Sequence, residues 1–71
     1  MNTTVIKRLG KNIKRYRLLA GLTQEELAEQ VNVHQTYIGK IEIGKCSPSI
    51  KLLFLISRKL KVRLSNIFDF D

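Results

Sequence analysis

Apolar side chains recur along this chain at intervals of three and four residues, which is the spacing of an amphipathic helix. In the first segment Leu9, Ile13, Tyr16 and Ala20 follow this spacing, and Gly21 is expected to end the helix as its C-terminal cap. Alternation of polar and apolar residues, the mark of a half-buried strand, is absent throughout. The pattern therefore predicts an all-α chain.

A second, short helix is predicted to begin at Thr23. An acid, Glu26, follows three residues later, so the pair fits a capping box. Asn32 tolerates the left-handed backbone conformation, which predicts a tight turn after the helix. The inward-facing residues are expected to be Leu27, Ala28 and Val31.

Three more helices are predicted after this turn. The third begins near His34 and ends at Gly44, with Ile38 and Ile41 toward the core. Its outer face carries Gln35, Thr36, Gly39 and Lys40. The fourth begins at a cap formed by 47–49, and its apolar side should contain Ile50, Leu53, Phe54, Ser57 and Leu60. A last short helix lies between Lys61 and Phe68.

The length and the charge narrow the class of protein. At 71 residues there is room for one domain, 1–71, with a modest core. The net charge of +7 predicts an anionic partner, nucleic acid or an acidic membrane surface. Charged residues before position 23 are all basic: Lys7, Arg8, Lys11, Lys14, Arg15 and Arg17. They form either a solvated face or a general attractive field, and Lys7, Lys11 and Lys14 are not expected to touch phosphate individually.

Other classes of protein receive little support from the sequence. Cys46 stands alone, so it can form no disulfide within the chain. The start lacks an apolar signal core, and the run Leu52 to Ile56 is too short to cross a bilayer, which predicts a cytoplasmic protein with no membrane association. Catalysis is not expected, because His34, Cys46 and Ser47 lie on different elements without a third supporting group. No cofactor or metal is implied.

Most of the chain resembles a known family. GLTQEELAEQV occupies positions 21–31 and HQTYIGKIEIGK occupies 34–45, followed by PSIKLL and LSNIF. Together with Arg17 these segments resemble the phage-repressor type of helix-turn-helix, which includes Cro-like repressors and xenobiotic-response-element regulators. The HQTYI tract is similar to controller proteins of restriction-modification systems. The resemblance implies a compact five-helix repressor-like domain, with the helix-turn-helix at about 23–42, that binds DNA and regulates transcription.

The resemblance also implies roles for particular residues. Gln35 and Thr36 should contact base edges in the major groove, and Gly39 and Lys40 lie beside them. An ion pair between Arg17 and Glu42 should lock the first helix to the end of the third. Phosphate contacts are expected at Arg17, Thr23, Gln24, His34, Tyr37 and Lys45.

Three of these residues have an alternative interpretation. His34 replaces the usual Ser or Thr cap, so it contacts phosphate or simply caps the helix. Tyr37 contacts a phosphate or packs its ring on the first helix and shows only its hydroxyl. Gly39 marks a close groove wall or is ordinary variation at a tolerant position.

A dimer is expected through the C-terminal region, 50–70. Leu52 and Leu55 fall on the solvent side of the predicted fourth helix, and with Ile67, Phe68 and Phe70 they form a candidate self-association patch. Small cores also expose some leucine, which is the alternative explanation. Two copies of the third helix about 34 Å apart would match an inverted repeat.

Two functional hypotheses follow. The first is a homodimeric regulator that occupies a double-stranded DNA operator and blocks or recruits RNA polymerase. The second is an antitoxin-like or other protein-interaction module on the same fold, in which the apolar patch matters more than Gln35. Membrane-surface binding by the first helix lacks the Trp or Phe anchors it would need.

Overall fold

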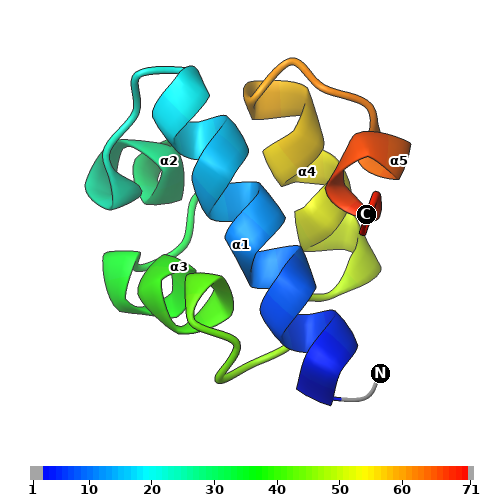
Figure 1. Cartoon of the computed structure of the whole chain (residues 1–71). Coiled ribbons are helices and arrows are strands. Elements are labelled where there is room, and N and C mark those ends of the chain that lie inside the picture. Colours follow the sequence, from blue (N-terminus) through cyan, green and yellow to red (C-terminus); the bar gives the residue numbers. More distant parts are fainter. Residues whose placement is uncertain (1–2, 71) are drawn as a thin grey trace.

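The computed structural model describes residues 3–70, which form five α-helices: α1 Thr3–Leu19, α2 Gln24–Gln30, α3 Gln35–Glu42, α4 Ile50–Lys59 and α5 Leu64–Ile67. α1 runs through the middle of the molecule, with α2 and α3 on one side and α4 and α5 on the other (Figure 1). Residues 3–70 contain no strand. The predicted five-helix, all-α fold is confirmed.

The predicted helix ends are largely confirmed. Thr23 Oγ1 accepts the N–H of Glu26 at 3.0 Å while Glu26 Oε1 accepts the N–H of Thr23 at 2.8 Å, which completes the capping box at the start of α2. Gly21 and Asn32 have φ of 75° and 61°, as expected for the turns after α1 and α2. Lys61, with φ of 59°, ends α4 in the same way, and no sequence signal indicated it.

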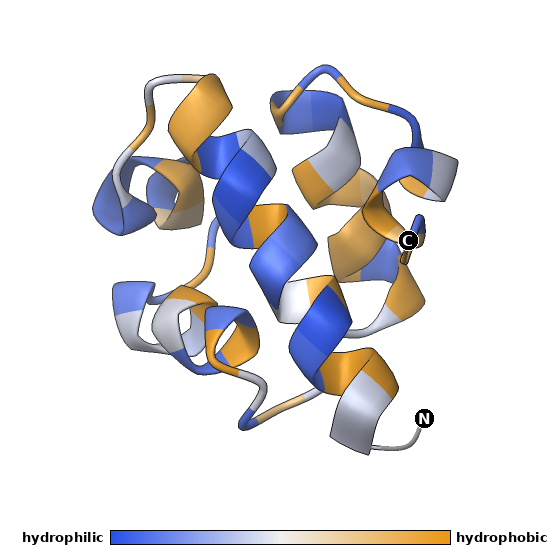
Figure 2. Ribbon diagram, in the orientation of Figure 1, coloured by the Kyte–Doolittle hydropathy of each residue, from blue (hydrophilic) through white to orange (hydrophobic). Residues whose placement is uncertain are grey.

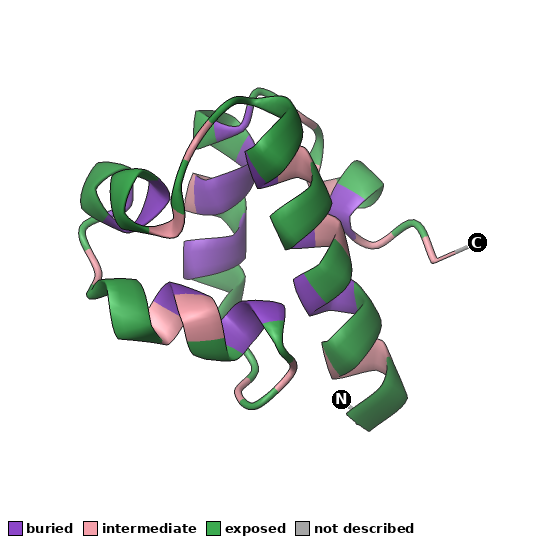
Figure 3. Cartoon of the chain, turned by 60° about the vertical axis from the view of Figure 1, so that its left-hand side comes forward, coloured by how far each residue is buried: buried purple, intermediate pink, exposed green. Residues whose placement is uncertain are grey.

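The core is made by apolar side chains from all five helices. Buried residues face the space between the helices in Figure 3, while the outer face of α1 is hydrophilic along much of its length in Figure 2. The predicted inward positions on α2 and α3 are confirmed. Ala20, predicted on the inward stripe of the first helix, is exposed and lies one residue past the end of α1. The buried apolar residues are Leu9, Ile13, Leu27, Ala28, Val31, Ile38, Ile41, Leu52, Leu53, Ile56, Leu60 and Ile67.

The buried face of α4 differs from the prediction. Ile50 and Phe54, assigned to the core, are 66% and 50% exposed, whereas Leu52, assigned to solvent, is 7% exposed. Both choices keep apolar residues three or four positions apart, so the periodicity of this apolar helix does not distinguish them. Packing of α4 against α2 and α5 decided the face.

The candidate self-association patch is therefore wrong in part. Leu52 and Ile67 belong to the core of the single chain, so they present no surface to a second copy. Leu55, Phe68 and Phe70 are half-buried against the same core, and the rings of Phe68 and Phe70 meet edge to face with centroids 6.1 Å apart. The large apolar side chains exposed on α4 are Ile50 and Phe54.

α1 approaches the C-terminal end of α3 through a glycine. A Cβ atom at Gly10 would collide with the carbonyl oxygen of Ile41 and would lie 2.8 Å from that of Glu42. The missing side chain lets the two backbones come together. The sequence pattern predicts no role for Gly10, although an isolated glycine inside a helical pattern often has a packing reason. This contact fixes how α3 is held on the rest of the molecule.

Candidate nucleic-acid interface

α2 and α3 form a rigid pair joined by a short turn. The N–H of Val33 donates to the carbonyl of Ala28 at 2.9 Å, and the left-handed residue Asn32 reverses the chain between the helices. Leu27 and Ile38 are fully buried and anchor the two helices on the core. This arrangement leaves the opposite side of α3 free of packing.

The outer face of α3 carries polar side chains. Gln35, Thr36 and Lys40 are all exposed, as predicted. With eight residues and a rise of about 1.5 Å per residue, α3 is roughly 12 Å long, which suits the major groove of B-DNA. Amide, hydroxyl and ammonium groups on this face can donate to and accept from base edges.

His34 caps α3. Its Nδ1 accepts the N–H of Thr36 at 3.0 Å, so the cap interpretation is confirmed. A ring nitrogen that accepts carries no proton, and the proton of the neutral ring is therefore on Nε2. This second nitrogen is left as a donor on an exposed side chain, and a phosphate contact through it stays a prediction.

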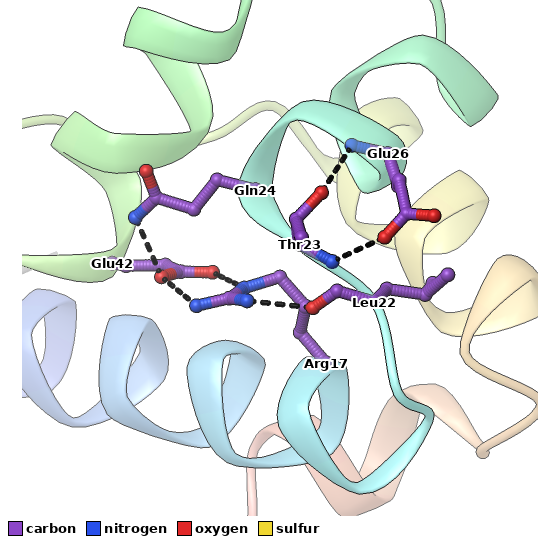
Figure 4. A network of polar contacts seen from close by, with 6 residues as sticks. All are labelled: Arg17, Leu22, Thr23, Gln24, Glu26 and Glu42. Carbon is purple, nitrogen blue, oxygen red and sulfur yellow. Dashed lines mark hydrogen bonds and ion pairs between the residues drawn. The ribbon is translucent and has the colours of Figure 1, made fainter.

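A network of hydrogen bonds joins α1, α2 and α3 (Figure 4). The predicted pair is confirmed: Arg17 Nε donates to Glu42 Oε2 at 2.7 Å and its Nη2 to Oε1 at 3.1 Å. Arg17 Nη1 also donates to the carbonyl of Leu22 at 2.7 Å. Gln24 Nε2 completes the network with a bond of 3.0 Å to Glu42 Oε1.

The burial of this pair changes the role assigned to Arg17. The side chains of Arg17 and Glu42 are only 7% and 1% exposed, and no buried side-chain polar atom in residues 3–70 lacks a hydrogen-bond partner. The guanidinium is committed to the fold and neutralised by the carboxylate. Arg17 as a phosphate contact is therefore wrong, because its charge is not presented to solvent.

Gly39 lies beside the Gln24 amide. A Cβ atom at Gly39 would be 3.5 Å from Gln24 Oε1, which is ordinary van der Waals contact. The folded chain therefore has room for an alanine here, and the glycine is not required by packing within the chain. The bond from Gln24 to Glu42 also places that half-buried amide between α2 and α3.

The start of α2 offers polar groups to an anion but also carries acids. The Thr23 hydroxyl accepts the N–H of Glu26 at 3.0 Å and belongs to the capping box. Hydrogen bonds from the backbone N–H and the side chain of Thr23 hold the pKa of Glu26 below its usual 4.5. Glu25 and Glu26 place negative charge in this first turn, so phosphate contacts by Thr23 and Gln24 stay predictions.

Tyr37 and Lys45 flank the pair of helices. Tyr37 lines a shallow depression between the 31–33 turn and α4, together with Val33 and Leu55. Its half-buried side chain packs against the core, and both interpretations of Tyr37 stay predictions. Lys45 is exposed just after α3, with its N–H bonded to the carbonyl of Lys40 at 2.9 Å.

Residues 3–70 offer neither a membrane-spanning helix nor a metal-binding cluster. No helix there is long and apolar enough to cross a membrane. No group of three or more His, Cys, Asp or Glu side chains in this part of the chain could hold a metal ion. The exposed polar face of α3 is thus the surface with the clearest chemistry.

Comparison with known proteins identifies the family. A family model described as helix-turn-helix matches residues 13–67, which is most of the chain. The chain belongs to this helix-turn-helix family. The match spans both helices of the motif, the buried Arg17–Glu42 pair and the packing helices α4 and α5.

The relatives of this family member are transcriptional regulators and controller proteins. An uncharacterised helix-turn-helix transcriptional regulator of Archaeoglobus fulgidus is 42% identical over 59 residues, covering 83% of each chain. The restriction-modification controller C.Esp1396I is 36% identical, with a TM-score of 0.84 over 94% of this chain and 88% of its own. The biofilm regulator SinR, solved in complex with DNA, is 35% identical, with a TM-score of 0.81 over 86% of this chain and 98% of that one.

Proposed function

We propose that this helix-turn-helix regulator binds double-stranded DNA in a sequence-specific manner as a homodimer, with α3 in the major groove. The observation that carries the proposal is the outer face of α3, where Gln35, Thr36 and Lys40 are exposed on a helix rigidly held from behind. The net charge of +7 supports it, because cationic side chains supply the salt-dependent part of DNA affinity. Regulation would follow from occupying an operator and blocking or recruiting RNA polymerase, with no catalytic step.

Three side chains are assigned to base contacts. Gln35 can pair through its amide with adenine N6 and N7, and the Thr36 methyl can pack on a thymine methyl. Lys40 can donate to guanine or to a phosphate. The proposed phosphate contacts around these side chains remain Thr23, Gln24, His34, Tyr37 and Lys45.

The dimer interface is assigned to the outer face of α4. Ile50 and Phe54 lie four residues apart on that face, and the Arg58 guanidinium sits 5.7 Å from the centre of the Phe54 ring. α4 and α3 lie on opposite sides of α1 (Figure 1). A two-fold axis beside α4 would therefore set the two α3 helices apart in a molecule 27 × 22 × 20 Å in extent, in keeping with half-sites about 34 Å apart.

Selection of bound duplexes from a random pool tests the base contacts. The wild type and Gln35→Ala would be compared at two salt concentrations. We expect the wild type to enrich an inverted repeat. The variant should lose or relax the base preference at one position in each half-site, a change of roughly 1–3 kcal/mol in binding free energy per bidentate contact. Salt-sensitive binding without enrichment would favour nonspecific coating of DNA, and no binding would favour the protein-interaction module.

Sedimentation tests the dimer assignment. Phe54→Glu places a charge on the proposed interface and should give a monomer with weakened binding to the full repeat. Leu19→Glu is the matched control, because Leu19 is an apolar side chain that is 73% exposed and belongs to α1 instead of α4. A dimer that survives Phe54→Glu, or that is lost equally in Leu19→Glu, would refute this interface.

A further inference from the structure

Lys7 lies against the turn that follows α3. A Cβ atom at Gly44 would be 2.6 Å from Lys7 Cγ and 3.0 Å from Lys7 Cα, so only a glycine allows this approach. Gly44 also has φ of 79°. Two separate features of the turn after α3 therefore require a glycine at position 44: its left-handed backbone conformation and the close approach of Lys7.

The contact places Lys7 beside the turn that carries Lys45. Lys45 follows Gly44 directly, and Lys40 is bonded through its carbonyl to the N–H of Lys45. All three lysines are exposed, and the one ion pair among residues 3–70 is that of Arg17 with Glu42. Exposed cationic side chains on one surface raise its affinity for an anion, so this end of α3 favours a negatively charged partner.

Capping of α3 does not explain Lys7. The carbonyls of the last turn already accept backbone N–H groups: Ile43 donates to Gly39, and Gly44 donates to Ile41 at 3.1 Å. No hydrogen bond from Lys7 to this helix end is found among residues 3–70. The ammonium group is therefore free to act outward.

The major groove has a phosphate backbone along each of its two edges. If α3 lies in the groove, the start of α2 faces one backbone, and the turn after α3 lies toward the other, beside the N-terminal half of α1 (Figure 1). Gly10 fixes α1 on the end of α3, so the Lys7 backbone is held rigidly there.

We propose that Lys7 contacts a DNA phosphate, together with Lys45, at the C-terminal end of the recognition helix. This inference rests on the proposed function, and it extends the interface onto α1. Each neutralised phosphate contributes about 0.9 to the slope of log affinity against log salt concentration. The two copies of Lys7 in a dimer contribute about 1.8. Without them, a four-fold rise in salt concentration should weaken DNA binding roughly 12-fold less than it weakens binding by the wild type.

The test is a salt titration of the full chain on the duplex selected by the wild type. Lys7→Gln should lower the slope by about 1.8 per dimer while the base preference stays the same. Lys7→Arg keeps the positive charge and should keep the wild-type slope. Lys59→Gln is the matched control, an exposed lysine at the far end of α4 from this turn (Figure 1), and it should leave the slope unchanged.

The outcomes distinguish a failure of the proposed function from a failure of the Lys7 contact. If the wild type selects no duplex, the proposed function itself fails. If it does select one and the slopes of Lys7→Gln and the wild type agree, the Lys7 contact is refuted. A fall in the thermal midpoint of Lys7→Gln with an unchanged slope would also refute it, since Lys7 would then be only a packing residue.

Discussion

Glu42 carries the negative charge of the buried network, and Glu42→Gln should destabilise the domain strongly. The substitution keeps the shape but removes the charge that neutralises Arg17, whose side chain is only 7% exposed. One terminal oxygen also becomes an NH₂ group, which would face a donor of Arg17 or Gln24 at about the present distances of 2.7 to 3.1 Å. An uncompensated buried charge costs about 3–5 kcal/mol.

This loss is large for so small a domain. At 71 residues the whole free energy of unfolding is about 4–11 kcal/mol. Glu42→Gln should therefore lower the thermal midpoint by roughly 12 °C or more. Urea unfolding followed by helical circular dichroism measures the free energy, and the slope with urea should stay unchanged if the change is in the native state.

Two further variants make the test specific. Glu29→Gln removes an exposed carboxylate from α2 and should change the stability by less than about 0.5 kcal/mol. Arg17→Met combined with Glu42→Leu removes the whole pair and should recover most of the loss, because apolar replacements of similar volume avoid the desolvation of both charges. A loss below about 1 kcal/mol in Glu42→Gln would refute the reasoning.

Three other substitutions have expected outcomes, all measured by urea unfolding. Gly10→Ala should destabilise by about 2 kcal/mol, because overpacking against the Ile41 carbonyl outweighs the better helix propensity of alanine; a gain in stability would contradict the close approach. Glu26 contributes stability at pH values above 4.5, lost as the pH falls through its lowered pKa. Glu26→Gln should remove this part of the pH dependence, and an unchanged profile would rule out the carboxylate. Lys61→Gly should stabilise by about 0.5–1 kcal/mol, since it relieves a left-handed backbone at some cost in chain entropy, and a loss would show that the lysine side chain matters more.

The sequence predicted much of this fold because its signals are local. The box of Thr23 and Glu26, the left-handed turn at Asn32 and the cap at His34 each depend on residues within three positions of one another. The outward face of α3 followed from the period of Ile38 and Ile41. These features were correct because few neighbours from elsewhere in the chain compete with them.

Apart from the left-handed Lys61, the features that were missed depend on distant contacts. α4 is apolar on more than one face, so only its packing against α2 and α5 decided that Leu52 is buried and Phe54 exposed. The burial of the Arg17 guanidinium was likewise invisible, although its pairing with Glu42 was implied by the resemblance.

By itself the sequence determined five helices, the helix-turn-helix and the polar face of α3, since helical period and capping chemistry are properties of short segments. Only the tertiary structure decided which face of α4 meets solvent and how close α1 comes to α3. The approach at Gly10 and the position of Lys7 beside Gly44 join residues more than 30 positions apart. Such contacts depend on how the helices cross, and crossing geometry is set by the whole core and not by any one segment.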